Sequence, residues 1–238
     1  MTSASPGPER PSSERGVLSV ETVADRVALL TLRRPERRNA LSIELRDALS
    51  ETLDALASDE AVSVVIITGE GPVFCAGFDL KEFETAAADP SFDRALWASS
   101  DRYHSTLLQF PLPLIAAING PAIAGGFDLA VCCDVRIAST TTVFSHPEFA
   151  WGDVVYSPLH ELVGGAIARE LVLTGRTISA HEALDLHLVS RVVTPETVVE
   201  VALDYARMMT QSTRPLLQRS KAKILARAGI ANAPTLEL

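Results

Sequence analysis

Two short glycine-bearing segments each follow an apolar run, and both have the composition of a site that binds an anion through the backbone. They are FCAGFDL (residues 74–80) and NGPAIAGGFDL (residues 119–129). Small side chains let a ligand approach the backbone closely, and a helix that begins in the second segment would add a dipole that favours negative charge. One N–H group from each segment could donate to the same oxygen. We therefore interpret the pair as an oxyanion hole, which stabilises charge on a reacting carbonyl oxygen.

Other kinds of site fit these residues less well. For either segment taken alone, glycines that only permit a turn and close helix packing are the more common explanation. Neither segment has the spacing of a dinucleotide fingerprint or a P-loop. The segment HELVG (residues 160–164) lacks the second histidine of a zinc-protease helix, so we predict no metal site. Cys75 has no base placed beside it, so a nucleophilic role is disfavoured.

Four arginines gather in RRPERR (residues 33–38), although the protein as a whole is acidic. Its 238 residues include 21 Lys and Arg against 30 Asp and Glu, a net charge of −9. An acidic surface repels nucleic-acid phosphates, so we expect no nucleic-acid partner. The arginine cluster could hold the phosphates of a small ligand. A solvated charge cluster is an equally common explanation for any single one of the four.

The overall composition indicates a globular protein with one large core. Hydrophobic residues make up 47% of the chain, and three cysteines, two of them adjacent, are expected to be buried, reduced thiols of a cytoplasmic protein. No stretch offers about 20 uninterrupted apolar residues for a membrane span. The N-terminus lacks the apolar region of a secretory signal. Residues 1–16 are rich in Ser, Pro, Glu and Arg, and we expect a disordered tail there.

Strands and helices are predicted to alternate along the chain, which favours an α/β layered architecture. Apolar or alternating runs predict strands at residues 17–23, 27–32, 62–68, 114–118 and 135–138. Helices are predicted at about residues 91–109, 127–132 and 214–228. Further helices are predicted to begin at residues suited to N-cap positions, namely Ser42, Ser179 and Thr194.

Five separate pieces of the chain occur in one order: RPERRNALS (34–42), VVIITGEGPVFCAGFDL (64–80), PLIAAINGPAIAGGFDLAVCCDVRIAS (113–139), FSHPEFAWG (144–152) and GRTISAHEALDLHLVSRVV (175–193). Together they resemble the enoyl-CoA hydratase/isomerase (crotonase) superfamily, over about residues 17–230. The resemblance implies a spiral of ββα repeats, with a core domain at 17–193 and a shortened C-terminal helical region at 194–238. It implies an acyl-CoA ligand, whose coenzyme A is part of the substrate, and no separate cofactor.

The resemblance also assigns roles to residues by their position in these motifs. The N–H groups of Phe78 and Gly125 would form the oxyanion hole, and Asp128 and Glu148 would be the acid–base carboxylates that move protons at Cα and Cβ of a thioester enolate. Coenzyme A would lie against residues of the arginine segment and the first loop, namely Arg38, Ala40, Cys75, Ala76, Gly77, Asp79 and Leu80. Without the motifs, Asp128 reads as a surface helix residue, Glu148 as a loop residue and His146 as a core or solvated histidine.

Three features depart from the family's common pattern. Many hydratases carry glutamate where this chain has Asp128, and the dienoyl-CoA isomerases that carry aspartate there have a further aspartate where this chain has Tyr156. The segment at residues 153–158 has valines and a tyrosine where hydratases are rich in Pro, Gly and Ala, which suggests a reshaped pocket. The chain also stops at Leu238, so we expect a changed pocket lid and an effect on oligomerisation.

Three functions remain open at this stage, and we give them in order of preference. The first is an enoyl-CoA hydratase, a lyase of fatty acid metabolism, that adds water to a 2-enoyl-CoA with both carboxylates. The second is a double-bond isomerase that uses Glu148 alone. The third is a non-catalytic acyl-CoA-binding or interaction protein. By the resemblance we expect a homo-oligomer, a trimer or hexamer, with no membrane partner.

Overall fold

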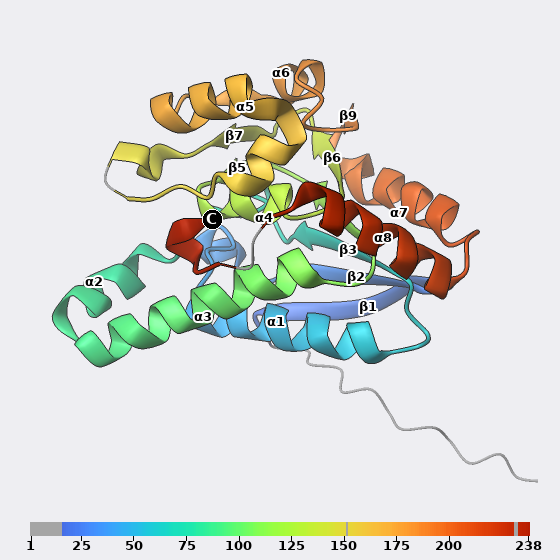
Figure 1. Ribbon diagram of the computed structural model, residues 1–238, viewed down its shortest axis with the longest axis horizontal. Coiled ribbons are helices and arrows are strands. Elements are labelled where there is room, and N and C mark those ends of the chain that lie inside the picture. Colours follow the sequence, from blue (N-terminus) through green and yellow to red (C-terminus); the bar gives the residue numbers. More distant parts are fainter. Residues whose placement is uncertain (1–15, 151, 231–232) are drawn as a thin grey trace, which may run out of the picture.

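The computed structural model describes residues 16–150, 152–230 and 233–238. The disordered tail was expected at residues 1–16, of which residues 1–15 lie outside the described residues. Helices and strands alternate through most of the chain, in layers around the main sheet (Figure 1). The predicted α/β class is confirmed.

The main sheet has six strands in the order β1-β2-β3-β4-β6-β9. These are β1 (Leu18–Ala24), β2 (Val27–Leu32), β3 (Val64–Gly69), β4 (Leu114–Ile118), β6 (Val135–Ser139) and β9 (Arg191–Val193). The first pair is antiparallel and every later pair is parallel. All residues of β3 and β4 are buried, as expected for central strands that are covered on both faces.

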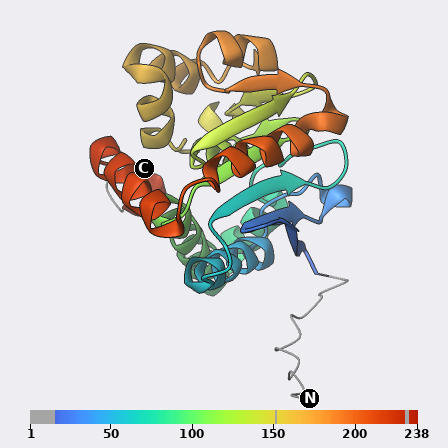
Figure 2. The same ribbon diagram turned by 90° about the vertical axis from the view of Figure 1, so that its right-hand side faces the viewer.

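Helices cover both faces of this sheet, and the sheet separates the core into two apolar clusters. Val65 and Ile67 of β3 pack into the larger cluster, together with α1 (Ile43–Ser58) and α3 (Pro90–Gln109), whereas Val64 and Ile66 pack against α7 (Val198–Met209). Successive residues of a strand point to opposite faces, which separates the two clusters. The remaining α-helices are α2 (Leu80–Ala88), α4 (Gly125–Val131), α5 (Ser157–Thr174), α6 (Ala180–Asp185) and α8 (Arg214–Ala228). Figure 2 shows α7 (orange-red) lying alongside the main sheet.

A second, small sheet brings together the segments that the resemblance identifies as functional. It consists of β5 (Ala122–Ile123), β7 (Val143–Ser145) and β8 (Ile178–Ser179). Because β5 and β7 pair in parallel, the segments that follow these two strands leave the sheet at the same end. Cys75 of the first loop forms a further bridge to Ala122. Backbone pairing therefore places both glycine-bearing loops and the segment after β7 at one location.

Most predicted elements agree in position with the structure to within a few residues, but several elements were missed. The N-cap at Ser42 is confirmed, because its side chain accepts a hydrogen bond from the Leu45 amide. Thr194 is the N-cap residue with Pro195 after it, as predicted, but it begins a short 3-10 turn (Pro195–Thr197) that precedes α7, and its side chain makes no capping hydrogen bond. Helices α2 and α5 were not predicted, and neither were the short strands β5, β7, β8 and β9. Within α5, Gly164 has a φ of 76° and kinks the helix, which interrupts its apolar periodicity.

Among the described residues, no helix is both long enough and apolar enough to cross a membrane.

Candidate active site

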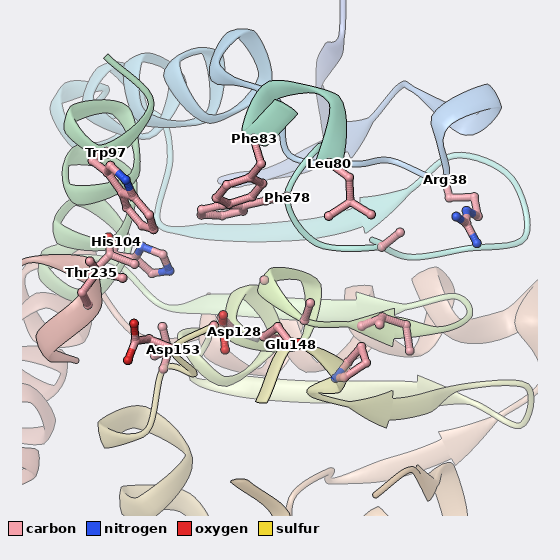
Figure 3. A pocket seen from close by; sticks show the side chains of 18 residues that line it. Arg38, Phe78, Leu80, Phe83, Trp97, His104, Asp128, Glu148, Asp153 and Thr235 are labelled. Atoms are coloured by element: carbon pink, nitrogen blue, oxygen red, sulfur yellow. Dashed lines mark hydrogen bonds between the residues drawn. The ribbon is translucent and has the colours of Figure 1, made fainter. Parts of the chain in front are cut away.

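A cavity of about 520 Å³ opens between the two glycine-bearing loops, α3 and the segment that follows β7. Figure 3 shows Arg38 at one end, Asp128 and Glu148 near the middle, and an aromatic group with His104 at the other end. The lining is mostly apolar, with a few polar groups directed inward, as is common for small-molecule sites. Of the predicted site residues, the cavity is lined by Arg38, Ala76, Phe78, Leu80, Gly125, Asp128 and Glu148. The other four predicted residues, Ala40, Cys75, Gly77 and Asp79, are not among the residues that line it.

The amide N–H groups of Phe78 and Gly125 have no hydrogen-bond acceptor within the described part of the chain. Around Phe78, the Leu41 amide donates to Gly77 O (2.8 Å) and the Asp79 amide donates to Leu41 O (3.4 Å), so the bridge to Leu41 leaves the Phe78 amide unused. Gly125 begins α4, where the first amides have no partner within the helix. Both amides are therefore available to a ligand oxygen.

The two loops approach each other more closely than side chains would allow. Gly77 has a φ of 85°, and a Cβ at this position would lie 2.7 Å from the Ala124 Cβ and 3.0 Å from the Gly125 nitrogen. Ala124 itself has a φ of 53°, in the left-handed region that L-residues rarely adopt. Its amide donates to Ser145 O of β7 (2.9 Å), which fixes this conformation. Backbone strain and backbone hydrogen bonds thus set the direction of the Gly125 N–H.

Asp128 and His146 form a buried pair beside these amides. Asp128 lies one turn into α4 and His146 directly follows β7, so the β5–β7 pairing brings them together. The His146 Nε2 lies 2.9 Å from the Asp128 Oδ1. The His146 side chain is 1% exposed and the Asp128 side chain is 8% exposed. Asp128 is therefore neither a surface residue nor free, because one of its oxygens is held by a histidine.

Glu148 is the second carboxylate, and it lies in a short 3-10 turn at Pro147–Ala150. Burial raises the pKa of Glu148 to about 7; the nearby His146 opposes this rise and the charge of Asp128 adds to it. Its Oε2 is buried and has no hydrogen-bond partner among the described residues. A carboxyl group that titrates near neutral pH can both take up and release a proton under physiological conditions. Glu148 thus has the properties of a general acid–base.

One donor atom from each of Asp128, His146 and Glu148 lies within 4.8 Å of the other two. The His146 Nε2 and Asp128 Oδ1 are hydrogen-bonded to each other (2.9 Å). That bond already accounts for the close approach of two of the three groups. The absence of a metal therefore stays a prediction.

The arginine segment divides into structural and free residues. Arg34 donates to the Ala40 carbonyl and to Asp79 Oδ2 (2.9 Å), and Arg33 pairs with Glu70 (3.1 Å). Arg38 is exposed, lines the cavity and has no ion-pair partner among the described residues. Of the four guanidinium groups, Arg38 is the one that lies at the cavity and is free to bind an anion there.

Cys75 and Asp79 have structural contacts rather than ligand-facing ones. The Cys75 thiol is fully buried and donates to the Asn39 carbonyl, and burial raises its pKa to about 12, which excludes a reactive thiolate at neutral pH. Asp79 caps α2 by accepting from the Lys81 amide. These residues shape the loop from behind its ligand-facing surface.

Four lining residues at the aromatic end were missed from the sequence. Phe78, Phe83 and Trp97 form a chain of ring contacts with centroids 6.1 Å apart at each step, while His104 and Thr235 lie beside them. Phe83 and Trp97 lie on α2 and α3, whose apolar faces could have been read for cavity-facing aromatics. No local signal could have found Thr235, because it reaches the cavity from 131 residues beyond His104, to which it hydrogen-bonds (3.1 Å).

The segment at residues 153–158, whose sequence departs from the common hydratase pattern, lies at the cavity. Asp153 and Val155 line it, and so does Leu236 near the C-terminus. The Leu238 carbonyl accepts hydrogen bonds from the amides of Tyr156 (3.2 Å) and Ser157 (2.6 Å), which attaches this terminal turn to the start of α5. The last residues therefore form part of the cavity wall in this protein.

An α/β fold with two backbone amides and two carboxylates at one cavity defines a protein of the crotonase type. The family model for enoyl-CoA hydratase/isomerase matches residues 22–236, and the chain belongs to that family. A 2,3-dehydroadipyl-CoA hydratase from Escherichia coli is 38% identical over 203 residues, which cover 82% of this chain and 77% of the relative.

Solved structures give the same family with two activities in their names. An enoyl-CoA hydratase from Bacillus anthracis superposes with a TM-score of 0.84 at 31% identity, covering 90% of this chain and 84% of that one. A monofunctional enoyl-CoA isomerase from M. smegmatis superposes with a TM-score of 0.78 at 31% identity, covering 91% and 96%. Similarity of this degree identifies the family and leaves hydratase and isomerase as alternatives.

Proposed function

We propose that this protein is a 2-enoyl-CoA hydratase, which adds water across the double bond of an acyl-CoA thioester. The observation that carries the proposal is the convergence of two unpaired backbone amides, Phe78 and Gly125, with the carboxyl groups of Asp128 and Glu148 at one cavity. Arg38 at the cavity end would bind a phosphate of coenzyme A.

The chemistry follows from the positions of these groups. The thioester oxygen would accept hydrogen bonds from both amides, and the negative charge that develops when water attacks Cβ would be stabilised there. Glu148 in its ionised form would take a proton from the water as its oxygen bonds to Cβ. The protonated Glu148 would then deliver a proton to Cα, so that one water is added and the carboxylate is regenerated. Asp128 would hold the water in position.

A spectrophotometric assay tests the proposal directly. We expect loss of the enoyl thioester absorbance when the protein is mixed with a 2-enoyl-CoA, and a short-chain and a long-chain substrate should be compared. A 3-enoyl-CoA serves as the parallel substrate. Conversion of the 3-enoyl-CoA alone would contradict the hydratase proposal, and turnover of neither would favour a non-catalytic acyl-CoA-binding protein.

The hydrogen bond between Asp128 and His146 supports a second candidate, a double-bond isomerase. Isomerisation needs one group that takes a proton from one carbon and returns it to another, which Glu148 could do alone. Asp128, with one oxygen committed to His146, would then be dispensable for the proton transfer.

Replacement of Asp128 by Asn distinguishes the two candidates. In a hydratase we expect Asp128→Asn to lower kcat for 2-enoyl-CoA by about 100-fold, because the group that holds the water loses its charge. In an isomerase the change should be much smaller. A variant that hydrates 2-enoyl-CoA at the wild-type rate would show that the two-carboxylate mechanism is wrong.

A further inference from the structure

His146 is held on two sides within the site, although the proposed reaction gives it no task. Its Nε2 lies 2.9 Å from Asp128 Oδ1. One face of its ring stacks on Phe127, with centroids 4.6 Å apart and an interplanar angle of 20°. Its side chain is 1% exposed. The imidazole therefore has one orientation, and that orientation directs its nitrogen at a catalytic carboxylate.

The charge of this imidazole follows from what surrounds it. An ionised carboxylate only accepts hydrogen bonds, so Nε2 must carry the proton in the bond to Asp128. Burial lowers the pKa of His146, but the charge and the hydrogen bond of Asp128, with the charge of Glu148, outweigh burial and raise it. A second carboxyl group, that of Glu148, is also close: one oxygen from each carboxyl group and one ring nitrogen of His146 all lie within 4.8 Å of one another.

Other titratable groups around the pair are neutral and cannot replace this charge. Burial lowers the pKa of His104, on α3, and raises the pKa values of the hydroxyl and thiol groups that also face Asp128, namely Tyr103, Cys75 and Cys132. No Lys or Arg forms an ion pair with Asp128 or Glu148 among the described residues. Among the described residues, His146 is therefore the titratable group near both carboxyl groups that could supply a positive charge.

We propose that His146 is a positioning residue: as an imidazolium bonded to Asp128, it fixes that carboxylate and allows Glu148 to ionise beside it. The inference rests on the acid–base function proposed above and applies to addition of water and to isomerisation alike. A histidine that only filled space would not affect the protonation of Glu148. The two roles therefore differ in their effect on the pH dependence of the reaction.

Two substitutions separate the charge of His146 from its hydrogen bond. His146→Gln keeps an N–H donor for Asp128 but removes the positive charge, whereas His146→Leu removes both. In the wild type, kcat/KM should fall as pH drops through the pKa of Glu148, which is about 7. Without the imidazolium, Glu148 is harder to ionise, so both variants should show this fall at a pH about one unit higher.

The two variants should differ in rate at high pH, where Glu148 is ionised in each. We expect His146→Leu to be about tenfold slower than His146→Gln there, because Asp128 is no longer held in place. His181→Gln, on the exposed surface of α6, is the matched control and should leave the pH profile unchanged. An unchanged acidic limb in His146→Gln, or equal rates for the two variants at high pH, would overturn the proposal.

A measurement on the unaltered protein covers the case in which the variants do not fold. With ¹⁵N-labelled histidine, NMR should show one buried imidazolium at pH 7, assigned to His146; only neutral buried imidazoles at that pH would overturn the proposal. This spectrum does not depend on turnover. If the wild type converts no enoyl-CoA, the proposed function fails, and the NMR result still decides the charge of His146.

Discussion

At the scale of single residues, Asp128 and Glu148 show how two carboxyl groups in one site acquire different properties. Asp128 shares a hydrogen bond with His146, which holds one of its oxygens in place. Glu148 has a buried, unpartnered oxygen, and burial raises its pKa to about 7. The two groups therefore suit different tasks: one carboxyl group is held in a fixed position, while the other gains and loses a proton near neutral pH.

Replacing Glu148 by Gln should remove the group that moves the proton. We expect Glu148→Gln to lower kcat by about 100-fold or more for either reaction, the scale of a lost general base. Steady-state kinetics with 2-enoyl-CoA and 3-enoyl-CoA would measure it. Glu161→Gln, on the exposed part of α5, is the control, and turnover within a few fold of wild type in Glu148→Gln would remove Glu148 from the mechanism.

At the scale of elements, the site depends on how closely two loops approach. Gly77 can approach the backbone of residues 123–125 because it has no side chain, and the pairing of β5 with β7 holds the second loop. The oxyanion hole is thus a property of paired strands and their loops, in which each amide is aimed by contacts made elsewhere.

A methyl group at Gly77 should separate the loops. Its Cβ would lie 2.7 Å from that of Ala124, so we expect Gly77→Ala to lower kcat by about 100-fold through a displaced amide. Gly71→Ala is a matched control: Gly71 has nearly the same positive φ, 81°, but its Cβ would meet only Pro35. Both variants should lose roughly 1 kcal/mol of stability from the positive φ, and Gly77→Ala should lose more because of the close contacts. Equal kcat values would contradict the proposed hole.

The exposed arginine segment offers a second element-scale prediction. Arg38 lines the cavity and Arg37 does not, yet both are exposed. We expect Arg38→Glu to weaken coenzyme A binding more than Arg37→Glu, which makes the same change in net charge. Calorimetric titration at low and high salt would measure this, and wild-type affinity should fall as salt screens the contact. Equal affinities in the two variants would show that Arg38 acts only through overall charge.

At the scale of the whole molecule, the catalytic site is expected to cost stability. The pKa of Glu148 is about 7 in the folded protein against an ordinary value of 4.5. The folded state therefore binds more protons than the unfolded state between these values, and stability falls as pH rises through this window. The cost is complete above about pH 7, where Glu148 is ionised in both states.

Glu148→Gln should remove this cost, so the inactive variant should be more stable than the wild type at pH 8. We expect a gain in the free energy of unfolding on the order of 2 kcal/mol at pH 8, and almost none at pH 4. Urea unfolding at both pH values would measure it. A gain of the same size at both would point to improved packing instead of relief of a buried charge.

The sequence by itself determined the α/β class, most of the strands, the Ser42 cap and the family. These features depend on local apolar patterns and on motifs that lie within single segments, so neighbouring residues suffice to specify them. Phe78, Gly125, Asp128 and Glu148 were found in this way because each belongs to a recognisable motif. Their assigned roles remain predictions.

Only the tertiary structure decided which of these residues face the cavity and what charges they meet there. The pairing of β5 with β7 brings His146 to Asp128 across 18 residues, and Thr235 reaches His104 across 131. Cys75 and Arg38 were both predicted to contact coenzyme A, yet Cys75 is buried and Arg38 lines the cavity. Burial and hydrogen bonding depend on what packs around a residue, and those neighbours come from segments far apart in the chain.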